Sequence, residues 1–214
     1  MKKRGEADSE GAWSGGKAKA QGPRSGAGFC LRRSESDRAL WPLRSVTTAW
    51  FRARFTAHDI YEITGAALER RGIRLLLADL DNTLVPYGVP LPDERLKGWR
   101  DDLNAHGVTL FILSNNRHED RPRIFSEGLG VPYIGHAGKP KTPSFIKAME
   151  RMGVTKEQTA IVGDQIFTDV LGGNLAGVSA ILVEPIRLAG NPGRYLRYAV
   201  EWPFRLLSGK GERL

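Results

Sequence analysis

The chain has 214 residues, of which 41% are hydrophobic, and these values fit one globular domain with loose ends. A single cysteine, Cys30, excludes an internal disulfide framework and fits a reducing compartment. No apolar run is long enough to span a bilayer, and the basic start of the chain lacks the apolar stretch of a secretory signal. We therefore expect a cytoplasmic location.

The net charge of +8 is concentrated at the two ends of the chain. Residues 1–44 carry ten Lys/Arg and five Asp/Glu, residues 186–214 carry six and two, and residues 45–185 carry sixteen and seventeen. Basic ends fit solvated tails or peripheral contact with an anionic membrane, and we predict no specific nucleic-acid partner. Composition predicts a disordered tail over 1–40, a domain over 41–190 and a basic, aromatic extension over 191–214.

The domain begins with a segment rich in aromatic residues and arginine, residues 41–55. This composition fits either an arm that packs on its own domain or a segment that lies at a membrane surface. Residues 56–71 are predicted to be helical in part, with Thr56 as a cap.

Short apolar runs predict five strands, at residues 75–78, 108–113, 131–134, 159–162 and 178–183. Helices are predicted between them, at residues 93–105, around 118–128, from Pro143 onwards and after Thr168. In the first of these helices Leu96, Trp99 and Leu103 share the buried face, and in the third Phe145, Met149 and Met152 do so. Thr142 and Thr168 stand where the last two helices need a cap.

Alternating strands and helices predict an α/β fold with a Rossmann-like parallel sheet and helices on both faces. Ligands of such sheets bind at the carboxyl ends of the strands, and the polar residues of this chain fall there. Asp79 and Asp81 follow the first strand of the sheet, Ser114 and Asn115 the second, and Asp164 the fourth. Lys139 lies shortly after the weak third strand.

These side chains favour phosphoryl transfer. Asp79, Asp81, Asp164 and Asp169 would bring up to four negative charges into one crevice, which implies a divalent cation. Oxygen ligands without His or Cys favour Mg²⁺ over zinc. A cation, a lysine and hydrogen-bond donors suit a transferring phosphoryl group, and an aspartate nucleophile can divide the transfer into two steps.

Four motifs occur in an order that resembles the phosphatases of the haloacid dehalogenase (HAD) superfamily. They are DLDNT at 79–83, SNN at 114–116, GKP at 138–140 and GDQIFTD at 163–169. The resemblance covers about residues 40–190. Within the superfamily, ADLDNTLVPY, LSNN and GDQIFTDVLGGNLAG are most similar to the YqeG-type group of subfamily IIIA, which is linked by similarity to phosphatidylglycerophosphate phosphatases.

The resemblance implies a role for each motif residue. Asp79 would be the nucleophile that forms an aspartyl-phosphate, Asp81 would be the acid and base, and Thr83 would orient Asp81. Ser114 and Asn115 would hold the phosphoryl oxygens. Lys139 would balance the charge, with Lys141 as the rival for this role. Asp164 would bind Mg²⁺ together with Asp79 and the Asp81 carbonyl. Asp169 would support the metal shell or hold Lys139, or would merely favour the helix dipole.

Spacing leaves no room for a separate cap domain. Asp79 and Ser114 are separated by 34 residues, and Ser114 and Lys139 by 24, and both intervals are filled by the helices and strands already assigned. An uncapped crevice admits large substrates, such as a lipid headgroup, a protein or a nucleic-acid end.

Residues 194–202 place Tyr195, Ala199 and Trp202 on one helical face, with Arg194 and Arg197 at its edge. This helix either covers its own domain or lies on an anionic membrane. The resemblance to the YqeG-type group, together with the basic, aromatic ends of the chain, favours phosphatidylglycerophosphate as the phosphomonoester substrate. The alternatives are a soluble sugar- or nucleotide-phosphate phosphatase and a non-catalytic scaffold that keeps the HAD fold.

Overall fold

The computed structural model describes residues 49–118, 120–186, 192–208 and 212–213, with the backbone alone for 192–197, 207 and 208. The predicted tail over 1–40, Cys30 and Trp41 lie outside the described residues, as do the side chains of Arg194, Tyr195 and Arg197. The domain boundaries given above therefore stay predictions.

Seven strands form one sheet in the order β4-β3-β2-β5-β6-β1-β7, and every pair of named strands runs parallel. The strands are β1 (Phe55–Thr56), β2 (Leu75–Ala78), β3 (Thr109–Leu113), β4 (Tyr133–Ile134), β5 (Thr159–Gly163), β6 (Ser179–Leu182) and β7 (Glu212–Arg213). Ala78 is paired with Ile112 of β3 and Val162 of β5, so the carboxyl ends of the three central strands lie side by side.

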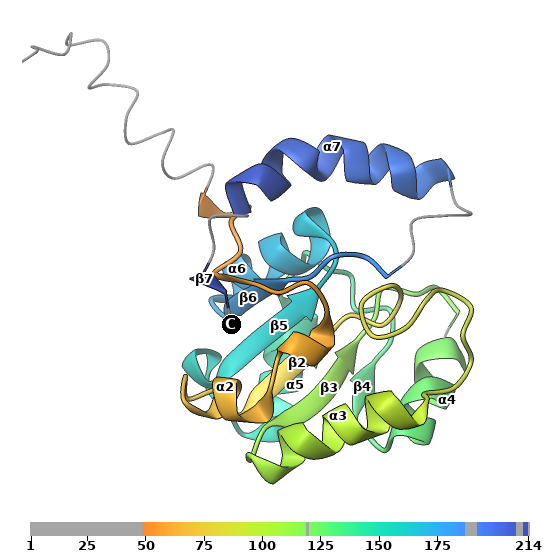
Figure 1. Cartoon of the computed structure of the whole chain (residues 1–214), viewed down its shortest axis with the longest axis vertical. Coiled ribbons are helices and arrows are strands. Elements are labelled where there is room, and N and C mark those ends of the chain that lie inside the picture. Colours follow the sequence, from red (N-terminus) through yellow and green to blue (C-terminus); the bar gives the residue numbers. More distant parts are fainter. Residues whose placement is uncertain (1–48, 119, 187–191, 209–211, 214) are drawn as a thin grey trace, which may run out of the picture.

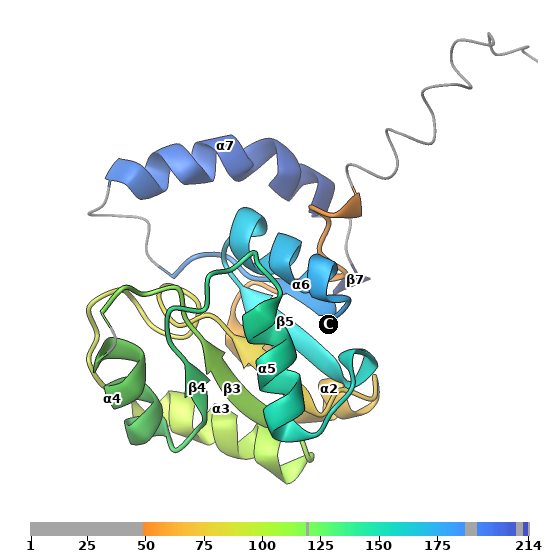
Figure 2. The ribbon, with the colours of Figure 1, turned by 180° about the vertical axis from the view of Figure 1, so that it is seen from behind.

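Helices cover both faces of the sheet (Figures 1 and 2). One face carries α2 (Gly65–Glu69), α3 (Glu94–Ala105) and α4 (Asp120–Leu129), and the other carries α5 (Pro143–Met152) and α6 (Leu171–Ala176). Figure 1 shows the last helix, α7 (Pro192–Ser208), lying across the edge toward which the strands point. The described residues also contain the short 3₁₀ helices η1 (Ile60–Glu62) and η2 (Lys156–Gln158) and the π-helix η3 (Ile166–Val170).

The central strand β2 is buried on both faces because its side chains alternate between two apolar clusters. Leu76 and Ala78 belong to the cluster that includes Trp99 of α3, and Leu75 and Leu77 belong to the cluster that includes Phe145 of α5. The predicted fold class and the five predicted strands are thus confirmed. Across residues 49–186, apart from residue 119, no cap domain interrupts the fold.

Two of the three predicted helix caps, Thr56 and Thr168, are wrong, and the third, Thr142, is in the predicted place. Thr56 ends strand β1, and the helices that follow are capped instead by Asp59 and Thr64. Thr168 lies inside η3, and the helix α6 continues from η3 without a side-chain cap. Thr142 precedes α5 as expected but makes no capping hydrogen bond, and α5 buries Ser144, Phe145 and Ala148 while Met149 and Met152 are only half-buried.

The described part of the segment before β1, residues 49–54, packs on the domain, as one of the two interpretations required. Phe51 contacts the rings of Phe167 and Phe204, with centroids 5.7 and 5.0 Å away, and Ala53 is buried. Strands β1 and β7, only two residues each, were not predicted, because β1 depends on its pairing with β6 and β7 on its pairing with β1, rather than on any pattern of their own. Among the described helices, none has the length and apolar character needed to cross a bilayer.

Candidate active site

A buried lysine joins two aspartates at the carboxyl edge of the sheet. Lys139 Nζ donates to Asp79 Oδ1 at 2.8 Å and to Asp169 Oδ1 at 2.6 Å. The side chains of Lys139 and Asp169 are each 1% exposed, so both ion pairs are shielded from water. Lys141, the rival for this role, is exposed. Buried charges of this kind are tolerated only when they are paired, and each member here has a partner.

Asp169 reaches Lys139 because Gly163, at the end of β5, has no side chain. A Cβ atom on Gly163 would lie 2.3 Å from the Asp169 carboxyl carbon. The second oxygen of Asp169 accepts hydrogen bonds from the Gln165 backbone N–H at 3.2 Å and the Thr168 hydroxyl at 3.3 Å. Asp169 therefore holds Lys139 and ties together the turn in which it lies, rather than merely standing at a helix start.

Thr83 is placed against Asp164 and not, as the resemblance implied, against Asp81. The Asp164 backbone N–H donates to Thr83 Oγ1 at 3.0 Å, and the Thr83 hydroxyl donates to Asp164 Oδ1 at 3.4 Å. The chain reaches this position by turning sharply after Asp79, with Asn82 in the left-handed region at φ 69°, which asparagine tolerates better than most residues. The turn thereby links the end of β2 to the end of β5.

Three carboxylates approach closely enough to share a cation. One oxygen each from Asp79, Asp164 and Asp169 lies within 4.8 Å of the others, and all three residues are buried. With these groups ionised, the cluster carries three negative charges against the single positive charge of Lys139. The carboxylate of Asp81 is not part of this cluster.

The Asp81 carboxylate is held by two residues that sequence reasoning missed. Arg121 donates to Asp81 Oδ1 from Nε at 3.1 Å and from Nη2 at 2.9 Å, and Asn116 Nδ2 donates to Asp81 Oδ2 at 2.9 Å. Arg121 also donates to the carbonyl of Val89, so one guanidinium joins α4, the loop after β2 and Asp81. The sequence does contain a signal for Arg121: it lies one helical turn before the buried Phe125, in the helix that follows β3.

Ser114 and Asn115 end β3 beside this cluster, but they have different contacts. The Ser114 hydroxyl is buried and accepts from the Asn116 backbone N–H at 3.1 Å. The Asn115 amide binds the main chain of Lys139: its oxygen accepts from the Lys139 N–H at 2.8 Å and its nitrogen donates to the Lys139 carbonyl at 3.0 Å. Asn115 therefore positions Lys139, and its second amide N–H and the Ser114 hydroxyl are the donors that these two residues can offer a ligand.

Burial and charge act in opposite directions on the two central groups. The pKa of Asp79 is raised to about 6 by three effects together: desolvation, the largest, raises it, the charge of Lys139 lowers it, and the charge of Asp169 raises it. Desolvation alone would lower the pKa of Lys139, but Asp169 and Asp79 outweigh it, so the pKa of Lys139 is raised above its usual value. At neutral pH Lys139 is therefore charged and Asp79 is mostly ionised, the form that a nucleophile requires.

Helix α7 reaches the same loop with two buried charged residues that sequence reasoning also missed. The Glu201 carboxylate accepts from the backbone N–H groups of Ile166 and Phe167 at 3.2 and 3.3 Å and so caps η3. Arg205 donates to the carbonyl of Asp164, and its Nη1 is 3.3 Å from Glu184 Oε2. The periodicity of α7 places Glu201 and Arg205 on one face, but nothing in the sequence indicates what that face meets.

The four histidines do not contribute to this site. His58, His118 and His136 are exposed, and His106 is half-buried on α3 with Nδ1 2.9 Å from the carbonyl of Asp102. The paired glycines Gly172 and Gly173 permit close packing: a Cβ on Gly173 would lie 2.4 Å from an Ile161 methyl carbon.

A parallel sheet with a buried aspartate–lysine–aspartate group at its carboxyl edge is the arrangement expected of a HAD-type hydrolase, and comparisons with known proteins agree. Residues 136–185 match the family model described as HAD-hydrolase-like. The chain is 40% identical over 150 residues to the "Probable phosphatase YqeG" of Bacillus subtilis (strain 168), covering 70% of this chain and 86% of that protein. It therefore belongs to the HAD hydrolase family, as a phosphatase of the YqeG group.

More distant similarities extend to two other phosphatases. The chloroplastic phosphatidylglycerophosphate phosphatase 1 of Chlamydomonas reinhardtii is 26% identical over 144 residues, covering 64% of this chain and 54% of that protein. The solved cobalt-bound deoxy-D-mannose-octulosonate 8-phosphate phosphatase of Haemophilus influenzae aligns with a TM-score of 0.43 and 18% identity, covering 66% of this chain and 92% of that chain.

Proposed function

We propose that this phosphatase hydrolyses phosphomonoesters through an aspartyl-phosphate on Asp79, with a Mg²⁺ ion bound beside it. The observation that carries the proposal is the buried Asp79–Lys139–Asp169 group, with one oxygen of Asp164 within 4.8 Å of an oxygen of each of the two aspartates. An ionised, immobilised carboxylate beside a charged lysine is suited to attack a phosphoryl group whose oxygens the lysine then stabilises.

Asp79 and Asp164 are the residues that would hold the ion, together with the backbone carbonyl of Asp81. Their oxygen donors fit Mg²⁺, and the excess of negative charge around Lys139 calls for a cation. When bound, the ion would offset the charge that the phosphoryl oxygens bring into the site.

In the first step the Asp79 carboxylate attacks phosphorus, the ester bond breaks, and the leaving alkoxide takes a proton from Asp81. In the second step Asp81, now ionised, accepts a proton from water, which attacks the phosphorus and releases phosphate with Asp79 restored. Arg121 and Asn116 hold the Asp81 carboxylate in one orientation.

For the substrate we propose phosphatidylglycerophosphate. The open carboxyl edge admits a lipid headgroup, and α7 presents exposed apolar residues beside it: Val200, Trp202 and Leu206 are 54–57% exposed. Of the helical face that the sequence singled out, Ala199 and Trp202 are exposed. Two relatives are named phosphatidylglycerophosphate phosphatases, which supports the same choice.

A substrate panel tests both parts of this proposal. Phosphate release is measured with phosphatidylglycerophosphate in mixed micelles and with glycerol, sugar and nucleotide monophosphates. We expect the highest kcat/KM for the lipid, no release by Asp79→Asn, and full activity for the matched control Asp101→Asn, an exposed carboxylate on α3. Preference for a soluble ester would indicate a sugar- or nucleotide-phosphate phosphatase, and no phosphate release from any ester would indicate a non-catalytic scaffold.

Membrane contact through α7 requires a separate measurement. A weakly bound amphipathic helix gains about 1 kcal/mol for each basic residue near an anionic surface, and salt screens this gain. We expect salt-sensitive co-sedimentation with anionic but not zwitterionic vesicles. The calcium concentration is kept low so that the vesicles do not aggregate. Arg194→Glu with Arg197→Glu should reduce it, whereas equal binding by this variant would contradict the assigned surface.

A further inference from the structure

A second polar cavity lies at the same edge of the sheet as the active site. It has a volume of about 270 Å³ and is lined by Thr56, Ala57, His58, Leu182, Glu184, Arg205 and Arg213. Residues 56–58 end and follow β1, and residues 182 and 184 end and follow β6. Because all these strands are parallel, the cavity opens on the carboxyl edge, beyond Asp164 in the strand order β2-β5-β6-β1.

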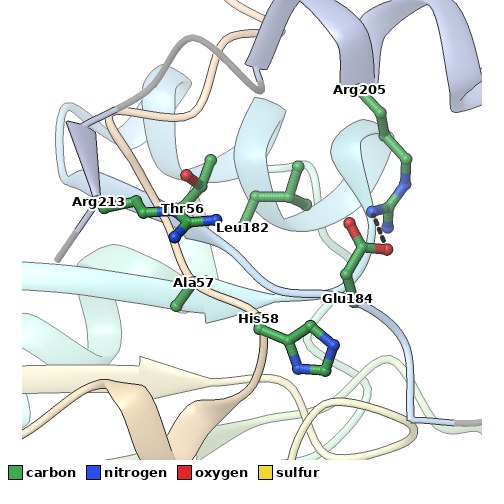
Figure 3. Close-up of a pocket in the computed structure, with 7 residues that line it drawn as sticks. All are labelled: Thr56, Ala57, His58, Leu182, Glu184, Arg205 and Arg213. Atoms are coloured by element: carbon green, nitrogen blue, oxygen red, sulfur yellow. Dashed lines mark hydrogen bonds and ion pairs between the residues drawn. The ribbon is translucent and has the colours of Figure 1, made fainter.

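Hydrogen-bond donors predominate in this cavity. Figure 3 shows the side chains of Arg205 and Arg213 approaching from opposite sides, one from α7 and one from β7. The Thr56 hydroxyl and the His58 imidazole complete the donors from the β1 side. Four potential donors from three parts of the chain therefore line a cavity that an oxyanion can fill.

Both arginines retain unused binding capacity. Arg205 is 8% exposed, and its Nε is buried without a hydrogen-bond partner. Within the part of the chain that the structure describes, the Arg213 guanidinium has neither a hydrogen bond nor an ion pair. Glu184 is the one carboxylate in the cavity, and it is already engaged by Arg205 at 3.3 Å and by the Tyr198 hydroxyl at 3.4 Å. The two arginines thus exceed the acidic charge.

We propose that this cavity is a binding site for the phosphate group of a phosphodiester or of free phosphate, distinct from the catalytic aspartates. It lies two to three strand positions from Asp79, roughly 10–14 Å at the usual spacing of parallel strands. The three carbons of a glycerol do not bridge such a separation, so the ligand is a second molecule and not the far end of the phosphomonoester being cleaved. Arg205, which also binds the Asp164 carbonyl, joins the two sites.

Glycerophosphoglycerol is the sharpest probe, because a phosphodiester offers Asp79 no terminal phosphoryl group. We expect the full-length protein in EDTA to bind one molecule in a calorimetric titration. Arg213→Glu and, separately, His58→Ala should weaken binding by about tenfold or more, the loss expected for a charge-assisted hydrogen bond. Arg70→Glu makes the same charge change at an exposed residue outside the cavity and should leave binding unchanged.

Two further arms identify the source of the anion. If the ligand is a lipid headgroup, Arg213→Glu reduces binding to phosphatidylglycerol vesicles more than Arg70→Glu does, and glycerophosphoglycerol competes. If it is free phosphate, inorganic phosphate binds with the same dependence on Arg213 while vesicle binding is equal in the two variants. Absence of binding to the wild-type protein, or equal affinity in Arg213→Glu, His58→Ala and Arg70→Glu, would overturn the proposal. Because no readout is catalytic, its failure leaves the proposed activity untouched.

Discussion

At the scale of single residues, the site is organised around the charge of Lys139. Its ammonium group pairs with Asp79 and Asp169, while Asn115 fixes its backbone through two hydrogen bonds. Removing one partner from such a group leaves an uncompensated buried charge, which costs on the order of 3–5 kcal/mol. The same contacts that stabilise the buried lysine therefore also fix the orientation of the Asp79 carboxylate.

Arg121 should be required for turnover although it does not reach the Asp79 cluster. Arg121→Leu removes both hydrogen bonds to Asp81 Oδ1, so Asp81 loses its orientation and its stabilising charge. We expect kcat to fall by about tenfold or more. Arg123→Leu, an exposed arginine of the same helix that pairs with Asp120 and Glu127, is the control and should keep full activity. Equal kcat values for the two variants would show that Arg121 is not involved.

The raised pKa of Asp79 makes a prediction about stability. In the metal-free protein this pKa lies at about 6, above the ordinary 3.8, so the folded state binds the proton more tightly than the unfolded state. The stabilisation that the tighter proton binding of Asp79 gives to the folded state is complete below pH 3.8 and is lost as the pH rises through 6. Across this window the wild type should lose on the order of 3 kcal/mol relative to Asp79→Asn.

Urea unfolding in EDTA at several pH values between 4 and 7.5 measures this difference. The free energy of unfolding of Asp79→Asn minus that of the wild type should increase with pH, whereas Asp101→Asn should differ from the wild type by a constant amount. A flat difference for Asp79→Asn would contradict the raised pKa.

At the scale of elements, the turn that carries Asp164 and Asp169 is supported from two directions. Thr83 binds Asp164 from the β2 side, and Glu201 and Arg205 bind the turn from α7. The aromatic contacts of Phe204 with Phe51 and Phe167 hold α7 against the segment before β1. Helix α7 thus contributes to the site by supporting the backbone of the turn that carries Asp164 and Asp169.

Glu201→Ala should test this support. It removes the acceptor for two backbone N–H groups at the start of η3, a loss of about 1–2 kcal/mol for a buried cap. We expect the free energy of unfolding to fall by this amount and kcat to fall with it, because Asp164 and Asp169 lie on the loosened turn. Val200→Ala, at an exposed position of the same helix, should change neither the free energy of unfolding nor kcat for a soluble phosphomonoester. Loss of stability with unchanged kcat would separate α7 from the active site.

The elements also show where sequence reasoning succeeds and where it ends. Leu75–Ala78 and the Leu96, Trp99 and Leu103 face of α3 were predictable, because burial on two faces or on one face leaves a direct pattern in the chain. The caps at Thr56 and Thr168 were wrong because the identity of a cap residue does not reveal where the chain turns. The turn at Asp59 and the π-helical path of η3 depend on tertiary contacts.

The candidate site shows the same division. The motifs indicated Asp79, Lys139 and Asp164, since each follows a strand and parallel strands bring their carboxyl ends together. The partner of each residue could not be read from the motifs: Thr83 binds Asp164, and Arg121 binds Asp81. These pairs join segments 81 and 40 positions apart, and their geometry depends on the packing of whole elements.

At the scale of the whole molecule, the described chain forms a single sheet, and the aspartates of the candidate active site, the second cavity and α7 lie at its carboxyl edge. The apolar residues of α7 are exposed on this side, where a membrane would bring lipid phosphates close to Asp79. This arrangement unites the proposed lipid substrate, the membrane contact and the second anion site in one surface.

A divalent cation should stabilise the whole fold through the carboxylate cluster. Mg²⁺ at 100 times its dissociation constant would add about 2.7 kcal/mol to the free energy of unfolding if it binds the folded state alone. Thermal unfolding should therefore shift upward with Mg²⁺ in the wild type and much less in Asp164→Asn. Asp101→Asn should shift as the wild type does, and an equal shift in Asp164→Asn would place the ion elsewhere.

The central claim is that Asp79 becomes phosphorylated during turnover, and trapping the intermediate tests it most directly. Asp81→Asn should slow the hydrolysis of the aspartyl-phosphate, so that it accumulates when substrate and Mg²⁺ are supplied. Borohydride reduces an aspartyl-phosphate to homoserine, which peptide mass spectrometry locates in the sequence. We predict homoserine at position 79 in the substrate-treated protein and none without substrate. Homoserine at another aspartate, or none anywhere while phosphate is still released, would contradict the covalent mechanism.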